Sequence, residues 1–485
     1  MTIGILEYGI YIPRRRLQRS AIHTANAWFA PGMKGLARGE KAVANWDEDP
    51  VTMAVEAARS CLGDRERESV DSVVLASTSH PFADRQNAGI VKEALNLGDA
   101  VSSMDFGGGL RAGVSALASA LLQPSRTTLC MAAERRGTKP GSEAEMTYGD
   151  AAAAILVGEG EPVAKLLGHH AVSADFVDHF RAGNADTDYN WESRWVRDEG
   201  YLKLGAGALK EALEKTGLEA SSVDHLIVPI VTRGVAAQMA KKAGIPEDAV
   251  CDVLLSEVGD TGAAHPLLLL AMVLEKAQAG ETVVLVGYGQ GAEVLVFEVM
   301  PAVEAARQGR CGAALARKSP ELNYMRHLAF TGSLSYELGM RAEQDQKTAL
   351  TALYRNRKAV LGLVGGKCTR TGTVQFPRSD ISVNQNERAI GTQEDYPLAD
   401  VPARILTFTA DSLTYSPDPP SRYGMVEFEG GGRMMAEFVD ADESDIAVGR
   451  QMRMAFRIKA IDEQRQFKRY FWKAIPAVSA SGMEG

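Results

Sequence analysis

Short apolar runs and helical stretches alternate along the first 300 residues of the chain. The apolar runs show no period-two alternation, which is typical of strands buried on both faces. Alternation of strands with helices favours a layered α/β fold. We expect helices at 49–62, 111–122, 202–216 and 266–279, and strands at 72–76, 127–131, 152–157, 225–231 and 282–286.

The same order of elements occurs twice. In each half a long helix precedes an aspartate and an apolar run, which begin at Asp71 and at Asp224. A Gly-rich turn then leads into an Ala/Leu-rich helix, at 107–120 and again at 259–274. Two copies of one supersecondary order indicate an internal duplication. We therefore predict two halves, 1–165 and 166–300.

The pattern changes after residue 300. Residues 301–363 are rich in Ala, Arg, Glu, Lys and Gln, and we expect a helical linker there. From residue 364 the chain is rich in Gly, Thr and Pro and carries short strand-like runs, of which 403–410, 424–429, 433–438 and 452–459 are the clearest. Short strands separated by turn residues predict a small β-barrel or sandwich over 364–478, followed by a tail at 479–485.

Composition narrows the class of protein. The 485 residues carry a net charge of −9, with 45% hydrophobic and 24% charged residues. This balance is ordinary for a globular protein and gives no support for a nucleic-acid partner. The five cysteines are scattered, without a C-x-x-C pair, which indicates a reducing compartment and no disulfide framework. We find no leader-like start and no membrane-length apolar run, so we expect a cytoplasmic protein without a membrane partner.

Several stretches within residues 1–300 resemble the archaeal and bacterial branch of hydroxymethylglutaryl-CoA synthase, a thiolase-superfamily enzyme. The resemblance implies a thiolase-like fold of two duplicated βαβ halves, layered α-β-α-β-α. It covers the first 300 residues in the expected order. The matching stretches are 4–13, 46–58, 77–83, 149–153, 175–176 and 287–292.

The C-terminal part, about 320–478, resembles the small OB-fold proteins that accompany thiolase-like enzymes, through residues 365–378. That family implies a rubredoxin-like zinc ribbon followed by an OB-fold barrel. A structural zinc needs four Cys or His ligands in paired spacing. Here Cys368 is present, but Thr371 stands at the paired position, and Ser382 and 384–387 occupy the region of the second pair. We predict a degenerate ribbon that binds no metal, and no cofactor for the chain as a whole.

The resemblance also implies the three groups of synthase chemistry, namely a cysteine nucleophile, a glutamate acid–base and a histidine that polarises the second acyl-CoA. In this chain Leu110 stands at the cysteine position and Thr78 at the glutamate position. The histidine position falls at or near Pro229. Because none of the three side chains can supply that chemistry, the sequence argues against ordinary synthesis and against cysteine-dependent thiolysis.

Four polar residues remain as candidates for acid–base catalysis on the loops that the resemblance assigns to the site. They are Asp260, His265, Tyr288 and His80. Each also has a structural interpretation. Asp260 would cap a helix and His265 would be a satisfied first-turn residue. Tyr288 would be a packing residue, and His80 would support its loop.

Candidate substrate-binding residues cluster at the start of the helix at 111–122. Gly107, Gly108 and Gly109 leave backbone N–H groups and space for an oxyanion or a phosphate, with Leu110 beside them. Arg111, Arg233 and Lys241 are candidates for contacts with the CoA phosphates, although solvated surface positions would explain them equally well.

Three functions follow. The first is an acyl-CoA enzyme that makes or breaks a carbon–carbon bond without a covalent acyl-enzyme, of the aldol or retro-aldol type on a β-hydroxyacyl-CoA. The second is a catalytically inactive subunit that scaffolds a thiolase-type complex, and the third is a specialised condensing or decarboxylating acyltransferase. The expected partners are an acyl-CoA substrate and a second copy of the chain, or another thiolase-type subunit. A pocket floored by Gly107 to Leu110, on which Asp260, His265 and Tyr288 converge, would favour the first function.

Overall fold

The computed structural model describes residues 2–123 and 126–477. The chain forms two compact units. The first comprises Met1–Asn45, Asp49–Val91 and Gly98–Leu334, and the second comprises Trp46–Glu48, Lys92–Leu97 and Ser335–Gly485. Each unit is described below by itself.

The first unit is built on a nine-stranded sheet with the order β11-β12-β13-β8-β1-β7-β6-β4-β5. The strands β4, β5 and β6 run parallel, as do β11 and β12, while β1, β7, β8 and β13 pair antiparallel. The bounds are β1 Thr2–Tyr11, β4 Ser72–Ala76, β5 Ser102–Phe106, β6 Thr128–Glu134, β7 Ala151–Gly160, β8 Ala164–Ser173, β11 His225–Ile227, β12 Thr282–Tyr288 and β13 Gly291–Val299.

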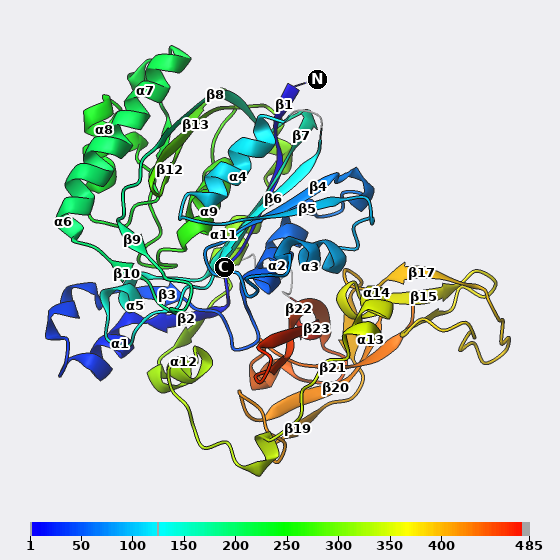
Figure 1. Cartoon of the computed structure of the whole chain (residues 1–485). Coiled ribbons are helices and arrows are strands. Elements are labelled where there is room, and N and C mark those ends of the chain that lie inside the picture. The colour runs from blue at the N-terminus through cyan, green and yellow to red at the C-terminus, as the bar shows by residue number, and fades with distance from the viewer. Residues whose placement is uncertain (1, 124–125, 478–485) are drawn as a thin grey trace. The chain divides into compact units, whose positions relative to one another are not determined.

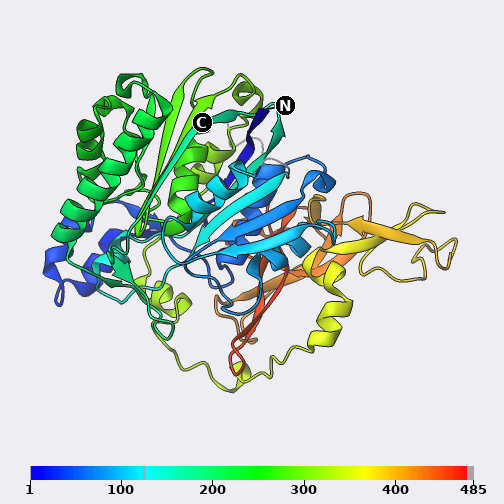
Figure 2. The same ribbon diagram turned by 45° about the horizontal axis from the view of Figure 1, so that its top comes forward.

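Two buried helices, α4 (Ala112–Leu121) and α9 (His265–Leu274), share one core with strands from both halves of the sheet. The helices α7 (Ala206–Thr216) and α8 (Val235–Ala243) pack in a separate core against β12 and β13. Figure 1 shows these layers, and Figure 2 shows from a second direction that α7 and α8, in green, lie outside the strands. The layering confirms the predicted thiolase-like architecture.

Glycine allows the two central helices to approach each other. A Cβ atom on Gly113 of α4 would lie 2.3 Å from the carbonyl oxygen of Ala263, in the short helix η6 (Gly262–Ala264) that leads into α9. Such a contact is far inside van der Waals distance, so a larger residue would push the starts of α4 and α9 apart. These two helix starts lie at the centre of the candidate site.

Smaller elements complete the first unit. The helix α2 begins with a capping box between Asp49 and Thr52, with Pro50 at its first position. The α-helices of this unit not yet given bounds are α1 Arg19–Asn26, α2 Pro50–Leu62, α3 Asn87–Ala94, α5 Glu143–Thr147, α6 Ser193–Trp195, α10 Val303–Ala306, α11 Arg310–Ala316 and α12 Tyr324–Phe330. Its remaining strands are β2 Arg15–Gln18, β3 Glu40–Ala42, β9 His179–Phe180, β10 Tyr189–Asn190 and β14 Ser319–Glu321. The last residues of α3 belong to the second unit.

The second unit contains two antiparallel sheets, as expected for the OB-fold region. One is β16-β15-β17, and the other has the order β19-β20-β18-β22-β23, with β21 paired to β20. The bounds are α13 Leu350–Arg355, α14 Arg357–Leu361, β15 Val364–Cys368, β16 Val374–Gln375, β17 Gln393–Pro397, β18 Ala403–Ile405, β19 Thr409–Asp411, β20 Ser421–Phe428, β21 Arg433–Glu437, β22 Gln451–Asp462 and β23 Phe467–Pro476.

Buried charge marks the interior of this second unit. The Lys473 ammonium lies 2.9 Å from the Asp47 carboxylate, and both side chains are almost completely buried. Arg457, equally buried, pairs with Glu48 at 3.1 Å and with Asp440 at 2.9 Å. The three residues Trp46–Glu48 therefore pack within this unit, although they lie more than 280 positions before its first strand, β15.

The predicted helical linker, 301–363, is divided between the units. Residues up to Leu334 belong to the first unit and include β14, which pairs with β2, whereas α13 and α14 belong to the second. The predicted tail at 479–485, and residue 478 of the predicted barrel, lie outside the described residues. Within the described ranges, no helix is long and apolar enough to cross a membrane.

Candidate functional site

The turn before α4 brings the predicted glycines beside the end of β4. Gly108 has a φ of +88°, a left-handed conformation that favours glycine. The Phe106 carbonyl accepts the Ser77 N–H at 3.0 Å and lies 3.1 Å from His80 Nε2. Leu110 is half-buried at the start of α4. An aliphatic side chain therefore occupies the position at which the resemblance implies a cysteine nucleophile.

A cavity of about 470 Å³ opens beside this turn. The predicted binding residues Gly107, Gly108, Gly109 and Arg111 all line it, whereas Leu110, Asp260, His265 and Tyr288 do not. Arg111 is held toward β8 by its bonds to the Val172 carbonyl and the Ser173 hydroxyl. The remaining lining residues are Phe106, Ala112, Ser115, Ser173, Ala174, Asp175, Gly289 and Gln290.

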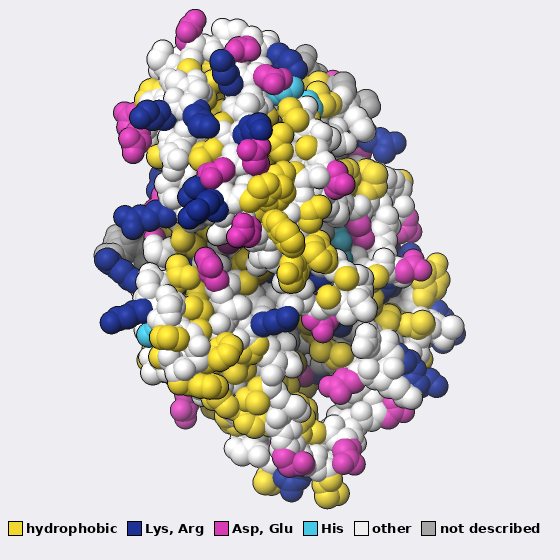
Figure 3. Space-filling view, turned by 60° about the vertical axis from the view of Figure 1, so that its left-hand side comes forward, with side chains coloured by type: hydrophobic (Ala, Val, Ile, Leu, Met, Phe, Trp, Pro, Cys, Tyr) yellow, Lys and Arg dark blue, Asp and Glu magenta, His cyan; other side chains and the backbone are white. Residues whose placement is uncertain are grey.

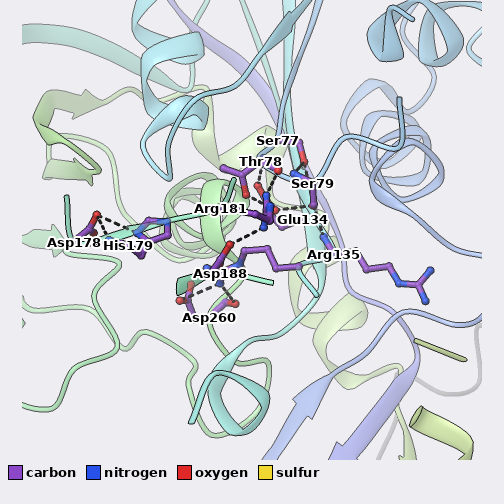
Figure 4. A network of polar contacts seen from close by, with 11 residues as sticks. Ser77, Thr78, Ser79, Glu134, Arg135, Asp178, His179, Arg181, Asp188 and Asp260 are labelled. Carbon is purple, nitrogen blue, oxygen red and sulfur yellow. Dashed lines mark hydrogen bonds and ion pairs between the residues drawn. The ribbon is translucent and has the colours of Figure 1, made fainter. Parts of the chain in front are cut away.

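A second polar group, which the sequence did not indicate, centres on Glu134 at the end of β6 (Figure 4). Its carboxylate is completely buried and accepts the Thr78 N–H at 2.5 Å, the Thr78 hydroxyl at 3.1 Å and the Ser79 hydroxyl at 2.8 Å. Burial raises the pKa of Glu134, and this effect outweighs the opposing influence of Arg136 and of the three hydrogen bonds.

Asp260 pairs with Arg136, two residues beyond Glu134. The guanidinium lies 3.0 Å from the Asp260 carboxylate and is completely buried, and it stacks over the Tyr148 ring at 3.6 Å. Asp260 Oδ1 also accepts the Gly262 N–H at 2.9 Å, in the turn that leads into η6. Burial alone would raise the pKa of Asp260, but Arg136, His265 and this N–H hold it below its usual range. The carboxylate is therefore a fixed anion and a weak base.

The β9–β10 hairpin closes the network from another side, as Figure 4 shows. Arg181 pairs with Asp188 at 2.7 Å and also donates to the Thr78 carbonyl. His179 lies 3.0 Å from Asp178. The network as a whole joins β4, β6, η6 and this hairpin, four segments that are distant in the sequence.

The same hairpin exposes aromatic rings. Phe180, Tyr189 and Trp191 are each about half exposed, and their ring centroids follow one another at 5.4 and 6.4 Å. Hydrophobic side chains gather between charged ones on the face shown in Figure 3. The hairpin therefore combines a buried ion pair with an apolar outer surface suited to stacking or docking.

His265 is the first residue of α9, and one of its ring nitrogens is hydrogen-bonded within the turn that leads into the helix. It is 1% exposed, and its Nδ1 accepts the Thr261 N–H at 3.0 Å. Burial lowers the pKa of His265, which keeps the imidazole neutral. This geometry matches the structural interpretation of His265, although its ring lies near Asp260.

Tyr288 lies on the other face of the sheet. Val114 of α4 contacts Gly287, and the next residue, Tyr288, packs in the α7–α8 core, with its ring edge-on to Tyr201 at 4.8 Å. A Cβ atom on Gly200 would come within 2.4 Å of the Tyr288 hydroxyl. Neither Tyr288 nor Asp260 lines the cavity beside Gly107–Gly109.

The remaining predicted residues are distributed around the site. Arg233 and Lys241 are exposed, at the start and end of α8. Pro229 is half-buried just after β11. Sequence reasoning missed Glu134 and Arg136. The sequence feature that could have indicated these two residues is the charged run Glu-Arg-Arg, which begins at the last residue of an otherwise apolar strand.

The region in which the sequence predicts a degenerate zinc ribbon contains two hydrogen-bonded turns, at Cys368 and at Asn384. The Cys368 thiol accepts backbone hydrogen bonds from Arg370 and Thr371, and Asn384 Oδ1 accepts those of Asn386 and Glu387 in the same pattern. Hydrogen bonds from Thr371 and Thr392 lower the pKa of Cys368 to about 6. Among the described residues, no three Cys, His, Asp or Glu side chains are grouped to hold a metal.

The fold and these sites define a thiolase-like α/β protein fused to an OB-fold domain. Residues 213–297 match the 3-oxoacyl-[acyl-carrier-protein (ACP)] synthase III C-terminal family, and residues 396–457 match the ChsH2 C-terminal OB-fold domain. The chain is homologous to hydroxymethylglutaryl-CoA synthases. It is 29% identical to that of Caldivirga maquilingensis over 310 residues, which are 62% of this chain and 88% of the relative.

Other comparisons agree. The hydroxymethylglutaryl-CoA synthase of Methanothermobacter thermautotrophicus is 28% identical over 344 residues, 68% of this chain and 99% of the relative. A crystal structure of hydroxymethylglutaryl-CoA synthase complexed with CoA superposes with a TM-score of 0.61, at 20% identity, over 72% of this chain and 95% of that one. The 3-oxoacyl-(acyl carrier protein) synthase III of Pseudomonas aeruginosa gives 0.56 at 22% identity, over 62% and 99%.

Proposed function

We propose that the chain is an acyl-CoA enzyme of the thiolase superfamily that makes or breaks a carbon–carbon bond without a covalent acyl-enzyme. Homology to hydroxymethylglutaryl-CoA synthases supports the acyl-CoA class. The absence of a covalent acyl-enzyme is inferred from Leu110 at the start of α4, because an aliphatic side chain cannot be acylated. Chemistry at this position must then proceed without a thioester to the protein.

A retro-aldol cleavage of a β-hydroxyacyl-CoA fits a site of this kind. The reaction needs a base at the β-hydroxyl and stabilisation of an enolate oxygen, but no nucleophile. Backbone N–H groups at Gly107, Gly108 and Gly109 are suited to the oxyanion, and Arg111 adds a positive charge to the same cavity. The exposed Arg233 and Lys241 are suited to CoA phosphates.

The alternative is a catalytically inactive subunit of a thiolase-type complex. Asp260 is paired with Arg136 and accepts the Gly262 N–H, and His265 Nδ1 accepts the Thr261 N–H, so two of the predicted acid–base residues have contacts that suit structural roles. The strand β5 lies at the end of the sheet with Met104 45% exposed, which leaves an edge where a second copy could pair.

Calorimetry with CoA thioesters separates these functions. The test uses the full chain with acetyl-CoA, 3-hydroxybutyryl-CoA and 3-hydroxy-3-methylglutaryl-CoA, followed by mass spectrometry for acetyl-CoA release from the two hydroxyacyl thioesters. Binding with cleavage supports the proposed enzyme. Binding without cleavage in either direction supports the inactive subunit, and failure to bind any thioester overturns the acyl-CoA assignment.

A further inference from the structure

Glu134 is the buried carboxylate of the network that lacks a paired cation. Asp260 pairs with Arg136 and Asp188 pairs with Arg181. Within the part of the chain that the structure describes, Glu134 forms no ion pair and is instead surrounded by hydroxyl and amide donors. The nearby Arg136 acts on Glu134 without a direct ion pair, and a buried carboxylate in that position exchanges protons more readily than one fixed as an anion by a bonded cation.

The two hydroxyl groups on Glu134 differ in what else they contact. Ser79 Oγ donates to Glu134 at 2.8 Å and also accepts the Arg135 N–H at 2.9 Å. Thr78 Oγ1 donates to the same carboxylate oxygen at 3.1 Å. Thr78 and Ser79 are both half-buried whereas Glu134 is completely buried, but the Ser79 hydroxyl already accepts the Arg135 N–H, so the Thr78 hydroxyl is the one suited to accept a proton from a ligand. A hydroxyl that donates its one proton still has lone pairs to accept another.

We propose that the Thr78 hydroxyl takes the proton from the β-hydroxyl of a bound hydroxyacyl thioester and passes its own proton to Glu134. This inference rests on the proposed retro-aldol function and identifies its base. Thr78 is the catalytic residue in this arrangement. Glu134 acts through Thr78 and is a positioning residue that holds the relayed proton.

The proposed step balances without any further reactant. The substrate O–H bond breaks as a new Thr78 O–H bond forms, and the original Thr78 proton moves to Glu134. The bond between the α and β carbons breaks, and its electron pair forms the thioester enolate while the β carbon becomes a carbonyl. The proton then returns from Glu134 through Thr78 to the α carbon of the enolate. The products are one carbonyl compound and one acyl-CoA.

The charged groups around Glu134 set its pH dependence. Arg136, two residues further along the chain, acts on Glu134 directly, while Asp260 pairs with Arg136 and Arg181 donates to the Thr78 carbonyl. Because burial raises the pKa of Glu134, the ionised form needed to accept a proton is lost on the acid side of that raised value. The cleavage rate should therefore fall as the pH falls, along one acid limb.

The test compares Glu134→Gln, Thr78→Val and Thr78→Ser with the wild-type chain in cleavage of 3-hydroxybutyryl-CoA and 3-hydroxy-3-methylglutaryl-CoA. Glu134→Gln and Thr78→Val should lower kcat by about 10²- to 10⁴-fold with little change in KM, and Thr78→Ser should restore most of the activity. The acid limb should disappear from the residual activity of Glu134→Gln.

The matched control is Glu145→Gln. Glu145 is also a buried carboxylate with a raised pKa, but its partners are Tyr324 and the Gly141 N–H, outside the network. This variant should keep the wild-type kcat and acid limb. Wild-type kcat in Thr78→Val, or an unchanged acid limb in Glu134→Gln, would overturn the relay alone. If the wild-type chain cleaves neither thioester, the proposed function fails and the relay falls with it.

Discussion

The Arg136 guanidinium lies 3.0 Å from the Asp260 carboxylate and is completely buried beneath it. This ion pair connects the end of β6 to the start of η6, and therefore to the helix α9. It converts the residue that sequence reasoning favoured as a base into a fixed anion. The carboxylate that we propose for proton transfer, Glu134, lies two residues before Arg136.

Removal of Asp260 should destabilise the first unit. Asp260→Ala leaves Arg136 buried without a counter-charge, and we expect a loss of about 3 kcal/mol in the free energy of unfolding. Asp260→Asn should cost less, because its amide oxygen can still accept the Gly262 N–H. Chemical denaturation measures both. The control is Asp198→Asn, which breaks an exposed pair with Arg197 and should change nothing measurable.

The same pair predicts a pH dependence. The pKa of Asp260 is lower in the folded chain than in the unfolded one, so its stabilisation is present above the unfolded value of about 4 and is lost as the pH falls through the folded value. The difference in unfolding free energy between wild type and Asp260→Asn should stay constant from neutral pH down to about 5 and shrink below about 4. A difference that grows on acidification would contradict the assigned direction.

Leu110→Cys should place a reactive thiol at the start of α4. A thiol at a helix N-terminus has a lowered pKa, and Leu110 is half-buried rather than enclosed. We expect iodoacetamide to alkylate it faster than the native Cys61, Cys130 and Cys311, whose thiols are buried with raised pKa values. Peptide mapping in a Cys368→Ser background measures the rates. A new thiol as inert as Cys130 would mean that the start of α4 is closed.

Arg233→Ala and Lys241→Ala should weaken CoA binding without affecting the fold. Both side chains are exposed, and we expect each change to raise the Kd for a CoA thioester by about 3- to 10-fold, with a smaller effect at high salt. Calorimetry at two salt concentrations is the measurement. Lys210→Ala, on the exposed face of α7, is the control and should leave Kd unchanged. Equal effects from all three variants would indicate general charge loss rather than a site.

Chelators should leave the second unit intact. The turns of this region are held by a hydrogen bond between the Cys368 thiol and the Thr392 hydroxyl and by one from the Asn384 amide to the Thr373 hydroxyl. We expect no zinc by elemental analysis and no shift of Tm when EDTA is added. A lower Tm in EDTA, or stoichiometric zinc in the purified chain, would refute the degenerate ribbon.

The buried pair of Asp47 and Lys473 should matter strongly to the second unit. Lys473→Met leaves the Asp47 carboxylate without its cation, which we expect to cost about 3 to 5 kcal/mol in the free energy of unfolding. The Asp47→Asn change removes the unpaired carboxylate. The double variant Asp47→Asn with Lys473→Met should therefore recover part of the lost free energy of unfolding. Additive losses in a double-mutant cycle would show that the two residues do not interact.

The sequence by itself determined several elements and their order, although the strand expected at 225–231 ends at Ile227 and the first residues of the helix expected at 202–216 are π-helical. The helix expected at 49–62 is α2, Pro50–Leu62, and the strand expected at 72–76 is β4. Local signals suffice for such elements, because capping residues and apolar runs act over a few positions. The resemblance also located the turn at Gly107–Leu110, and the fold class that it implied is confirmed.

Only the tertiary structure decided which side chains meet. A strand buried on both faces has no period-two pattern, so the sequence could not reveal that Gly287 contacts α4 while Tyr288 points into the α7–α8 core. Nor could it reveal that Glu134 reaches the hydroxyl groups of Thr78 and Ser79, which lie 56 and 55 positions away. Such contacts depend on the pairing of β4 with β6, and strand pairing is a long-range property of the folded chain.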